Sequence, residues 1–319
     1  MKKLSLLLIL IFPLLAISQV KKIYRKALRT TDLNEKITLL NQVIEEDPKN
    51  LDAYFYRALA KNDLGEYHSA IVDYSKIIVE EPDADTYYNR GNSKYSIKDF
   101  VGAKQDYAKA LMLDDSFIDA LYSLACTKLD LAEYENAIKD FSKVIKKVPD
   151  NSNTYILRAT AYKAIEQFKD ALTDYSTAIL INPSANNYFN RGAFLVDIKY
   201  YKEAHSDLTK AIKLNKNNAF AYFYRGASSL LLGTYTNAIA DFTEAIKFDT
   251  MDFDAYLGLA IAYYKTNDIA LAKLNFKRAN AILIPSNAIS SIEQYNNTFW
   301  FHNQYFYFNN ALNSLVKMK

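Results

Sequence analysis

Cysteine, glycine, proline and tryptophan are scarce in this sequence. Its 319 residues include one cysteine, seven glycines, six prolines and one tryptophan. The single cysteine, Cys126, excludes an intramolecular disulfide and a zinc site built from several cysteines. So few glycines and prolines argue against an all-β chain, which needs a turn about every ten residues. The composition therefore favours helices.

The charge pattern gives no sign of nucleic-acid binding or of a cofactor. The net charge is +3, to which Lys2 and Lys3 contribute two charges, and acidic and basic residues are interleaved along the rest. A nucleic-acid-binding protein needs a basic stripe, which is missing here. His68, His205 and His302 lie far apart and lack a metal-ligand spacing. No phosphate-binding loop or nucleophile motif occurs. We therefore expect that the protein binds no cofactor, metal or nucleic acid and that it is not an enzyme.

Long apolar runs are also absent, except at the N-terminus. Lys2 and Lys3 precede an apolar run from Leu4 to Ile17, which is shorter than the roughly 20 residues that span a bilayer. Small residues then precede Gln19, as a signal peptidase requires. We predict a signal peptide over residues 1–18 and no other membrane insertion, with an uncleaved anchor as the alternative.

The remaining chain repeats with a period of 33 or 34 residues. An alanine marks each period: Ala70, Ala103, Ala137, Ala171, Ala204, Ala238 and Ala272. Aromatic residues recur at fixed distances from these alanines, and apolar residues recur at spacings of three and four within each half of the repeat. That spacing indicates amphipathic helices, so each repeat predicts two helices joined by a short turn.

This pattern resembles the tetratricopeptide repeat (TPR) family over residues 51–286. Seven repeats are expected, at 51–83, 84–117, 118–151, 152–184, 185–218, 219–252 and 253–286. The resemblance implies an all-α, right-handed TPR-type superhelical solenoid of antiparallel helix pairs, which must stack because one pair cannot bury its apolar face. Small residues in the first helices, such as Gly91 and Gly192, are expected to face the alanines of the second helices, since close helix packing needs small side chains.

Both ends of the array depart from the repeat. Residues 19–50 are predicted to be a degenerate first repeat and N-terminal cap, because Lys36 replaces the alanine. Residues 287–319 carry no repeat motif and are predicted to form an aromatic-rich C-terminal capping helix. Ser290 and Glu293 form a capping box for it, and it would cover the apolar face left by the last repeat.

Two charged rows occupy fixed positions in the two halves of the repeat. The second halves carry Asp73, Asp106, Asp140, Asp174, Asp207 and Asp241, and the first halves carry Arg57, Arg90, Arg158, Arg191 and Arg225. Carboxylates in register could indicate metal binding. However, five of the seven repeats hold both residues, and pairing within a repeat leaves fewer mismatches than pairing between neighbours. We predict Arg–Asp pairs that fasten the two helices of one repeat.

A further polar row lies near the start of each first helix. It consists of Asp52, Asp85, Asp119, Asn153, Asn186 and Asp254. We interpret these residues as helix N-caps rather than as a charged recognition edge, because aspartate and asparagine satisfy free backbone N–H groups at that position.

The resemblance also implies a location for partner binding, because first helices line the concave face of TPR proteins. The candidate groove residues are Phe55, Tyr88, Asn92, Tyr122, Phe189 and Phe223. Family members that grip a chaperone's C-terminal carboxylate use lysine and asparagine or arginine here, and only Asn92 matches. An aromatic groove suits a partner segment with hydrophobic anchors. The alternative is that these aromatics mostly pack against neighbouring helices.

The C-terminal segment supplies a second candidate surface. Eight aromatic residues occur among the 14 residues from Tyr295 to Phe308, too many for one side of one helix. We predict an exposed docking patch for a partner or another copy of the chain. Its candidate residues are Trp300, Phe301, Tyr305 and Phe308.

Together these features predict a non-catalytic protein–protein interaction scaffold of the bacterial cell envelope or exterior. It would be periplasmic, envelope-associated or secreted. A self-associating structural array is the main alternative, followed by a carbohydrate-binding solenoid. The sequence does not predict which protein is the partner, because a fold does not identify one.

Overall fold

The computed structural model describes residues 19–283, 298–300 and 304–317. All regular secondary structure in these ranges is α-helical, which confirms the all-α prediction. The chain forms two compact units, Met1–Pro149 and Asp150–Lys319, and each is treated separately below. The predicted signal peptide lies outside the described residues.

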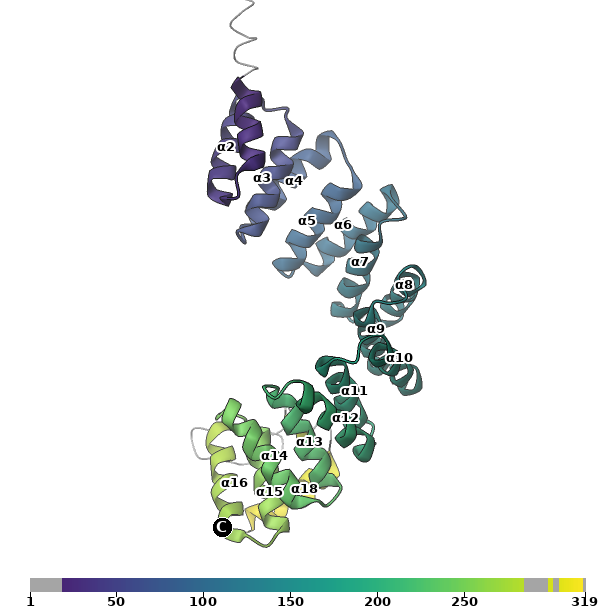
Figure 1. The fold of residues 1–319 in the computed structure, drawn as a ribbon, viewed down its shortest axis with the longest axis vertical. Coiled ribbons are helices and arrows are strands. Elements are labelled where there is room, and N and C mark those ends of the chain that lie inside the picture. Colours follow the sequence, from purple (N-terminus) through teal and green to yellow (C-terminus); the bar gives the residue numbers. More distant parts are fainter. Residues whose placement is uncertain (1–18, 284–297, 301–303, 318–319) are drawn as a thin grey trace, which may run out of the picture. The chain divides into compact units, whose positions relative to one another are not determined.

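The first unit begins with a helix over residues 19–29, followed by α2 (Leu33–Glu46). Three antiparallel pairs follow, each packed on the next along the chain (Figure 1). They are α3 (Leu51–Asp63) with α4 (Tyr67–Glu80), α5 (Ala84–Ser96) with α6 (Phe100–Leu113), and α7 (Ile118–Asp130) with α8 (Tyr134–Lys147).

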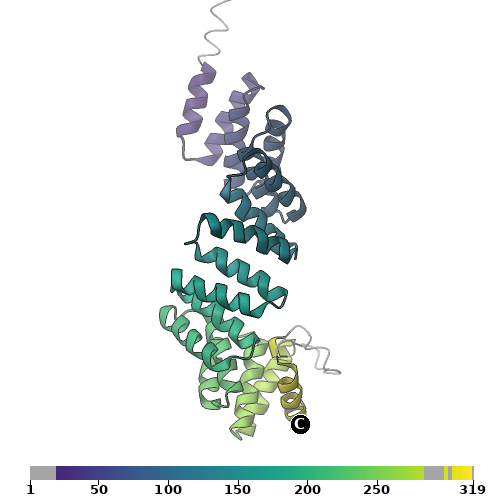
Figure 2. The ribbon, with the colours of Figure 1, turned by 90° about the vertical axis from the view of Figure 1, so that its right-hand side faces the viewer.

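The second unit holds four pairs and a C-terminal helix. The pairs are α9 (Ser152–Ala164) with α10 (Phe168–Ile181), α11 (Ala185–Asp197) with α12 (Tyr201–Leu214), α13 (Ala219–Leu231) with α14 (Tyr235–Phe248), and α15 (Phe253–Lys265) with α16 (Ile269–Leu283). Helix α18 (Tyr305–Val316) packs against α15 and α16, where it is drawn in yellow in Figure 2.

The first helices begin two residues earlier than the N-cap interpretation requires. The side chains that accept backbone N–H groups at these helix starts belong to Asn50, Asp83, Asn151, Ser184, Asn218 and Asp252. The N-cap interpretation of Asp52, Asp85, Asp119, Asn153, Asn186 and Asp254 is therefore wrong, because these residues already lie in the first helical turn. The carboxylates among them still interact favourably with the helix dipole.

The turn inside each pair places one residue in the left-handed region. These residues are Gly65, Lys98, Ala132, Glu166, Lys199, Gly233 and Asn267, with φ between 57° and 80°. The backbone N–H groups of this residue and the next bond to carbonyls of the last turn, as Lys98 and Asp99 do with Tyr95 and Lys94. This is a Schellman-type end, in which glycine is preferred but other residues are accepted at a cost.

Small residues let the two helices of a pair approach closely, and the glycines among them make room for a large side chain. The seven marker alanines are fully buried. A Cβ atom on Gly91 would lie 2.7 Å from the ring of Tyr107, and one on Gly192 would lie 2.8 Å from Leu208 Cγ. The first-helix glycines therefore leave room for the large residue four positions after the alanine, Tyr107 or Leu208.

The predicted Arg–Asp pairs are confirmed. In five pairs the arginine Nε and Nη2 atoms donate to the two oxygens of the buried aspartate at 2.6–2.9 Å. Asp140, whose repeat has Leu124 in place of arginine, instead accepts from Lys128 and Lys143. Lysines one turn after Arg57 and Arg90 also bind the same aspartates.

The third arginine nitrogen reaches the preceding helix pair. Nη1 of Arg57 donates to Asn41 Oδ1 at 2.8 Å, and Nη1 of Arg90 donates to Ser75 Oγ at 3.0 Å. In the second unit, Arg191 reaches Ser176 in the same way at 3.1 Å. Each such arginine therefore links its own second helix to the second helix of the pair before it.

We predict strong coupling between Arg191 and Asp207 in a double-mutant cycle. Either Arg191→Leu or Asp207→Ala leaves the other group buried without its partner, so each single change should cost more than its share of the double change. The coupling free energy, measured by urea unfolding, should be about 1–3 kcal/mol. The exposed pair Lys76–Glu80 is the control and should show much weaker coupling. Additive effects at Arg191 and Asp207 would contradict the prediction.

Candidate functional site

Each first helix presents one face on which the candidate groove residues lie. The residues at the second, fifth and ninth positions of a repeat are spaced by three and four, so they share one side of the helix. We call the surface formed by these three positions the first-helix face. It includes Asp119, Tyr122 and Cys126 on α7, and Asp254, Leu257 and Ile261 on α15.

The fifth-position aromatics pack partly against the second helix of their own pair. The ring of Phe55 lies 5.9 Å from that of Tyr74, and the ring of Tyr88 lies 5.9 Å from that of Tyr107. Tyr122 contacts Phe141 in the same way. Phe55, Tyr88, Tyr122 and Phe189 nevertheless remain half-buried, so packing accounts for only part of each side chain.

An open pocket of about 310 Å³ lies between α5 and α7. It brings together two of the predicted groove residues, Asn92 and Tyr122, and adds Tyr95, Ser96, Tyr107, Ser123 and Cys126. The hydroxyl of Tyr107 donates to Asn92 Oδ1 at 2.8 Å. Tyr95 and Ser96 follow Asn92 by three and four residues, a spacing that would have identified them from the sequence.

Cys126 lines this pocket but is not a reactive thiol. Burial raises its pKa from 9.0 to about 11. The thiolate is the nucleophilic form, so at neutral pH the side chain is an inert apolar group in the wall of the pocket.

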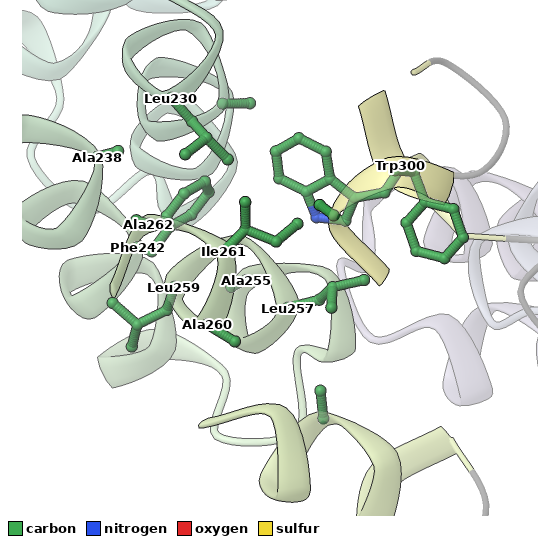
Figure 3. Packing of buried hydrophobic residues seen from close by; sticks show 14 of the residues in the cluster. Leu230, Ala238, Phe242, Ala255, Leu257, Leu259, Ala260, Ile261, Ala262 and Trp300 are labelled. Atoms are coloured by element: carbon green, nitrogen blue, oxygen red, sulfur yellow. The ribbon is translucent and has the colours of Figure 1, made fainter. Parts of the chain in front are cut away.

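In the second unit, the chain's own C-terminal segment covers the first-helix face. The ring of Phe299 lies 4.9 Å from Phe223 and 5.4 Å from Tyr224. Trp300 is fully buried, 6.2 Å from the ring of Phe223 and 6.1 Å from that of Phe242. Figure 3 shows its side chain directed toward Ile261 on α15.

Asp254 accepts hydrogen bonds from the main chain of Phe299 and from the indole of Trp300. The amide N–H of Phe299 donates to Asp254 Oδ2 at 3.1 Å, and Trp300 Nε1 donates to the carbonyl of Asp254 at 2.8 Å. One helical turn further along the segment, the hydroxyl of Tyr201 donates to Gln304 Oε1 at 3.1 Å. The segment is thus bound by edge-to-face ring contacts and by hydrogen bonds at both of its described parts.

The prediction of an exposed docking patch is wrong for Trp300 and Phe308, because both side chains are fully buried. They pack in one core cluster with α13, α14 and α15, and the segment gains more by covering that apolar face than by remaining in water. Phe301 and the side chain of Tyr305 lie outside the described residues.

The same segment also covers Phe223, one of the predicted groove residues. On α11, Phe189 and Ala193 are half-buried, whereas the equivalent positions on α13 and α15 are buried. The groove therefore changes along the second unit from a partly exposed surface to a covered one. Nothing in the repeat period signals this change, because the covering segment lies outside the repeats.

The described residues show neither a metal-binding cluster nor a membrane-spanning helix. No group of three or more histidine, cysteine, aspartate or glutamate side chains in the described ranges could hold a metal ion. Within the same ranges, no helix has the length and apolar character needed to cross a bilayer.

Family models match the chain at four places. Those described as tetratricopeptide repeat match residues 52–84, 119–151 and 185–218, and one described as TPR repeat matches residues 229–267. The chain is a tetratricopeptide repeat protein. Arrays of this family are generally non-catalytic scaffolds suited to protein–protein interaction.

Known relatives of this TPR chain share its repeats over part of their length. It is 28% identical to human tetratricopeptide repeat protein 13 over 124 residues, 37% of this chain and 14% of that protein. It is 30% identical to Hsp70-Hsp90 organizing protein 1 of Glycine max over 169 residues, 41% of this chain and 30% of that protein. The chain thus spans less than a third of either relative.

A solved TPR structure has the same fold over most of the chain. It is a tetratricopeptide repeat protein from Parabacteroides merdae, 18% identical in sequence, with a TM-score of 0.59. The match covers 81% of this chain and 99% of that one. At this identity the likeness concerns the fold alone.

We predict that Asp254→Asn stabilises the TPR array at neutral pH. Burial, followed by the nearby charge of Asp252, raises the pKa of Asp254 from 3.8 to about 6. A raised pKa in the folded state means that folding favours the protonated form, so stability is lost as pH rises from about 4 to 6. An asparagine can still accept from Phe299 and carries no charge, so at pH 7 the variant should be more stable by up to about 3 kcal/mol.

Trp300 fluorescence during urea unfolding measures this effect. The stability difference between variant and wild type should grow between pH 4 and 6 and stay constant above pH 6. Asp119→Asn, at the same position of α7 but exposed, is the control and should show no such growth. A difference that is independent of pH would contradict the role assigned to the Asp254 charge.

Proposed function

We propose that this chain is an exported, non-catalytic scaffold that binds segments of partner polypeptides on its first-helix face. The half-buried aromatics Tyr88 and Tyr122 support this, because partly exposed rings on a rigid helix provide contact area at little entropic cost. The open pocket beside Asn92 supplies a concave site on the same surface.

The proposal rests mainly on the way in which the first-helix face binds the chain's own C-terminal segment. On α13 and α15 the first-helix face binds a polypeptide through two aromatic side chains and a main-chain N–H. The corresponding positions in the first unit carry residues of similar type and remain partly exposed. A surface that binds one segment in this way is suited to bind another.

The relative from Glycine max lends further support to a binding function. Its name describes a protein that organises two others, Hsp70 and Hsp90. A scaffold that brings polypeptides together requires a rigid array and no catalytic group. The present chain offers such an array, although its groove is aromatic where a chaperone-tail clamp is basic.

Export rests on residues 1–18 of the sequence. Two lysines followed by an apolar run and small residues support a cleaved signal, and with it a location in the periplasm, at the envelope or outside the cell. We expect the native protein to begin at Gln19, which intact-mass measurement of material from its own host will check. A mass that still includes residues 1–18 would favour an anchored protein.

Peptide display on residues 19–319 tests the binding function. Selected peptides should bind the wild-type chain and lose about tenfold in affinity for Tyr88→Ala and Tyr122→Ala, since truncating a central aromatic removes most of a local contact. Met112→Ala, exposed on the second helix α6, is the matched control and should bind normally. Peptides that bind all three variants equally would place recognition on another surface.

Two alternative functions predict different results from those expected here. A self-associating array would yield no selected peptide and would form oligomers in light scattering. A carbohydrate-binding solenoid would bind glycans on an array and lose that binding in Tyr122→Ala. Either result would replace the proposed function.

A further inference from the structure

We propose that the pocket between α5 and α7 receives a tryptophan or tyrosine side chain from a partner polypeptide, and that the carboxylate of Asp119 accepts a main-chain N–H beside it. This inference rests on the proposed function, which it makes specific by naming the anchor and its site.

The argument begins with the surroundings of Trp300. Its ring lies near Phe223 and Phe242, it shares a core cluster with Leu257 and Ile261, and its segment is bonded to Asp254. Each of these residues has a counterpart 135 residues earlier, four repeats back along the chain. The counterparts are Tyr88, Tyr107, Tyr122, Cys126 and Asp119.

Four of these counterparts lie in or next to the pocket of the first unit. Tyr107, Tyr122 and Cys126 line it directly, and the ring of Tyr88 packs against that of Tyr107. Where Trp300 fills the position in the second unit, the first unit has an open pocket of about 310 Å³, which is larger than an indole ring. The repeat geometry therefore gives the first unit a pocket, large enough for an aromatic ring, at the position that corresponds to that of Trp300.

The lining determines which aromatic side chain fits. Asn92, Ser96 and Ser123 and the tyrosine hydroxyls make this pocket more polar than the seat of Trp300. Tryptophan and tyrosine combine a ring with a hydrogen-bonding group that this polar lining can meet, whereas phenylalanine offers the lining no such group.

Asp119 supplies the contact that indicates a polypeptide. Its side chain is exposed, at the position where Asp254 accepts the N–H of Phe299. A carboxylate in the first turn of a helix suits a main-chain donor that lies across the helix start. The partner is another polypeptide rather than a second copy of this chain, because Trp300 and Phe308 would have to leave their own core to bind elsewhere.

A short peptide tests the inference. The probe is an acetylated, fluorescein-labelled peptide with the sequence of residues 296–304, NNTFWFHNQ, titrated with the chain of residues 19–319 and followed by anisotropy. We expect saturable binding that weakens about tenfold when the peptide's tryptophan is changed to alanine. Replacing that tryptophan with tyrosine should preserve most of the affinity.

Protein variants locate the site. Ser96→Trp should fill the pocket from its exposed rim and weaken binding about tenfold, and Cys126→Phe should do so from within. Ser96 bonds only to a carbonyl of its own helix among the described residues, so its replacement leaves the fold intact, which the melting temperature will check. Asp119→Asn should weaken binding about threefold, and Met112→Ala should leave it unchanged.

Several results would overturn the inference. Equal affinity for Ser96→Trp and wild type would show that the peptide binds elsewhere, for example by displacing the C-terminal segment. A dimer that dissociates on addition of the peptide would make the occupant a second copy of the chain. If display yields peptides that lack tryptophan and tyrosine but still require Tyr88 and Tyr122, the proposed function stands and this anchor is wrong.

Discussion

One arginine in each of several repeats links three helices, and the regular stacking of the array depends on this link. Arg90 donates two hydrogen bonds to the buried carboxylate of Asp106 in its own pair and a third to Ser75 in the pair before. The planar guanidinium has donors in fixed directions, so it sets the orientation of all three helices at once. A lysine in the same place would supply charge without that geometry.

With the polar junctions fixed, the aromatic side chains determine how closely the helices approach. The ring of Phe242 lies between two glycines of successive first helices, since a Cβ on Gly226 would lie 3.0 Å from it and one on Gly258 only 2.5 Å. Larger residues at either glycine would push the helices apart. The first-helix face lies on another side of these helices, so the packing of the rings also sets the spacing of that face from one repeat to the next.

Sequence periodicity was sufficient to predict the helices, their pairing and the Arg–Asp contacts. The helices and their pairing recur in every repeat and the Arg–Asp contact recurs in five of the seven, so chance agreements cancel and the physical requirement remains. The N-caps were misplaced by two residues because both Asp83 and Asp85 are suitable capping residues, and only the backbone distinguishes them. The pocket residues Tyr95 and Ser96 followed the helical spacing and could have been predicted, although that spacing does not show that the pocket is open.

The covering of Phe223 by Phe299 and Trp300 could not be read from the sequence in the same way. It joins residues about eighty positions apart, one of them in a segment without a repeat, so no pattern specifies the contact. A physical reason for it is visible in the last pair, which has Leu259 and Asn275 where five other pairs have arginine and aspartate. Without the polar junction, α15 is apolar on both sides, and Leu257, Leu259 and Ile261 are all buried.

The last pair therefore depends on apolar contact where the others depend on hydrogen bonds, and the C-terminal segment supplies that contact. Not every polar group where this segment is bound forms a hydrogen bond. In the described structure, Asp254 Oδ1, Gln304 Nε2 and the Tyr307 hydroxyl are buried without a hydrogen-bond partner. Such groups cost stability, so the packing of the aromatic rings must more than offset them. The segment is thus held mainly by its aromatic side chains, and the partner binding that we propose for the first unit relies on the same kind of contact.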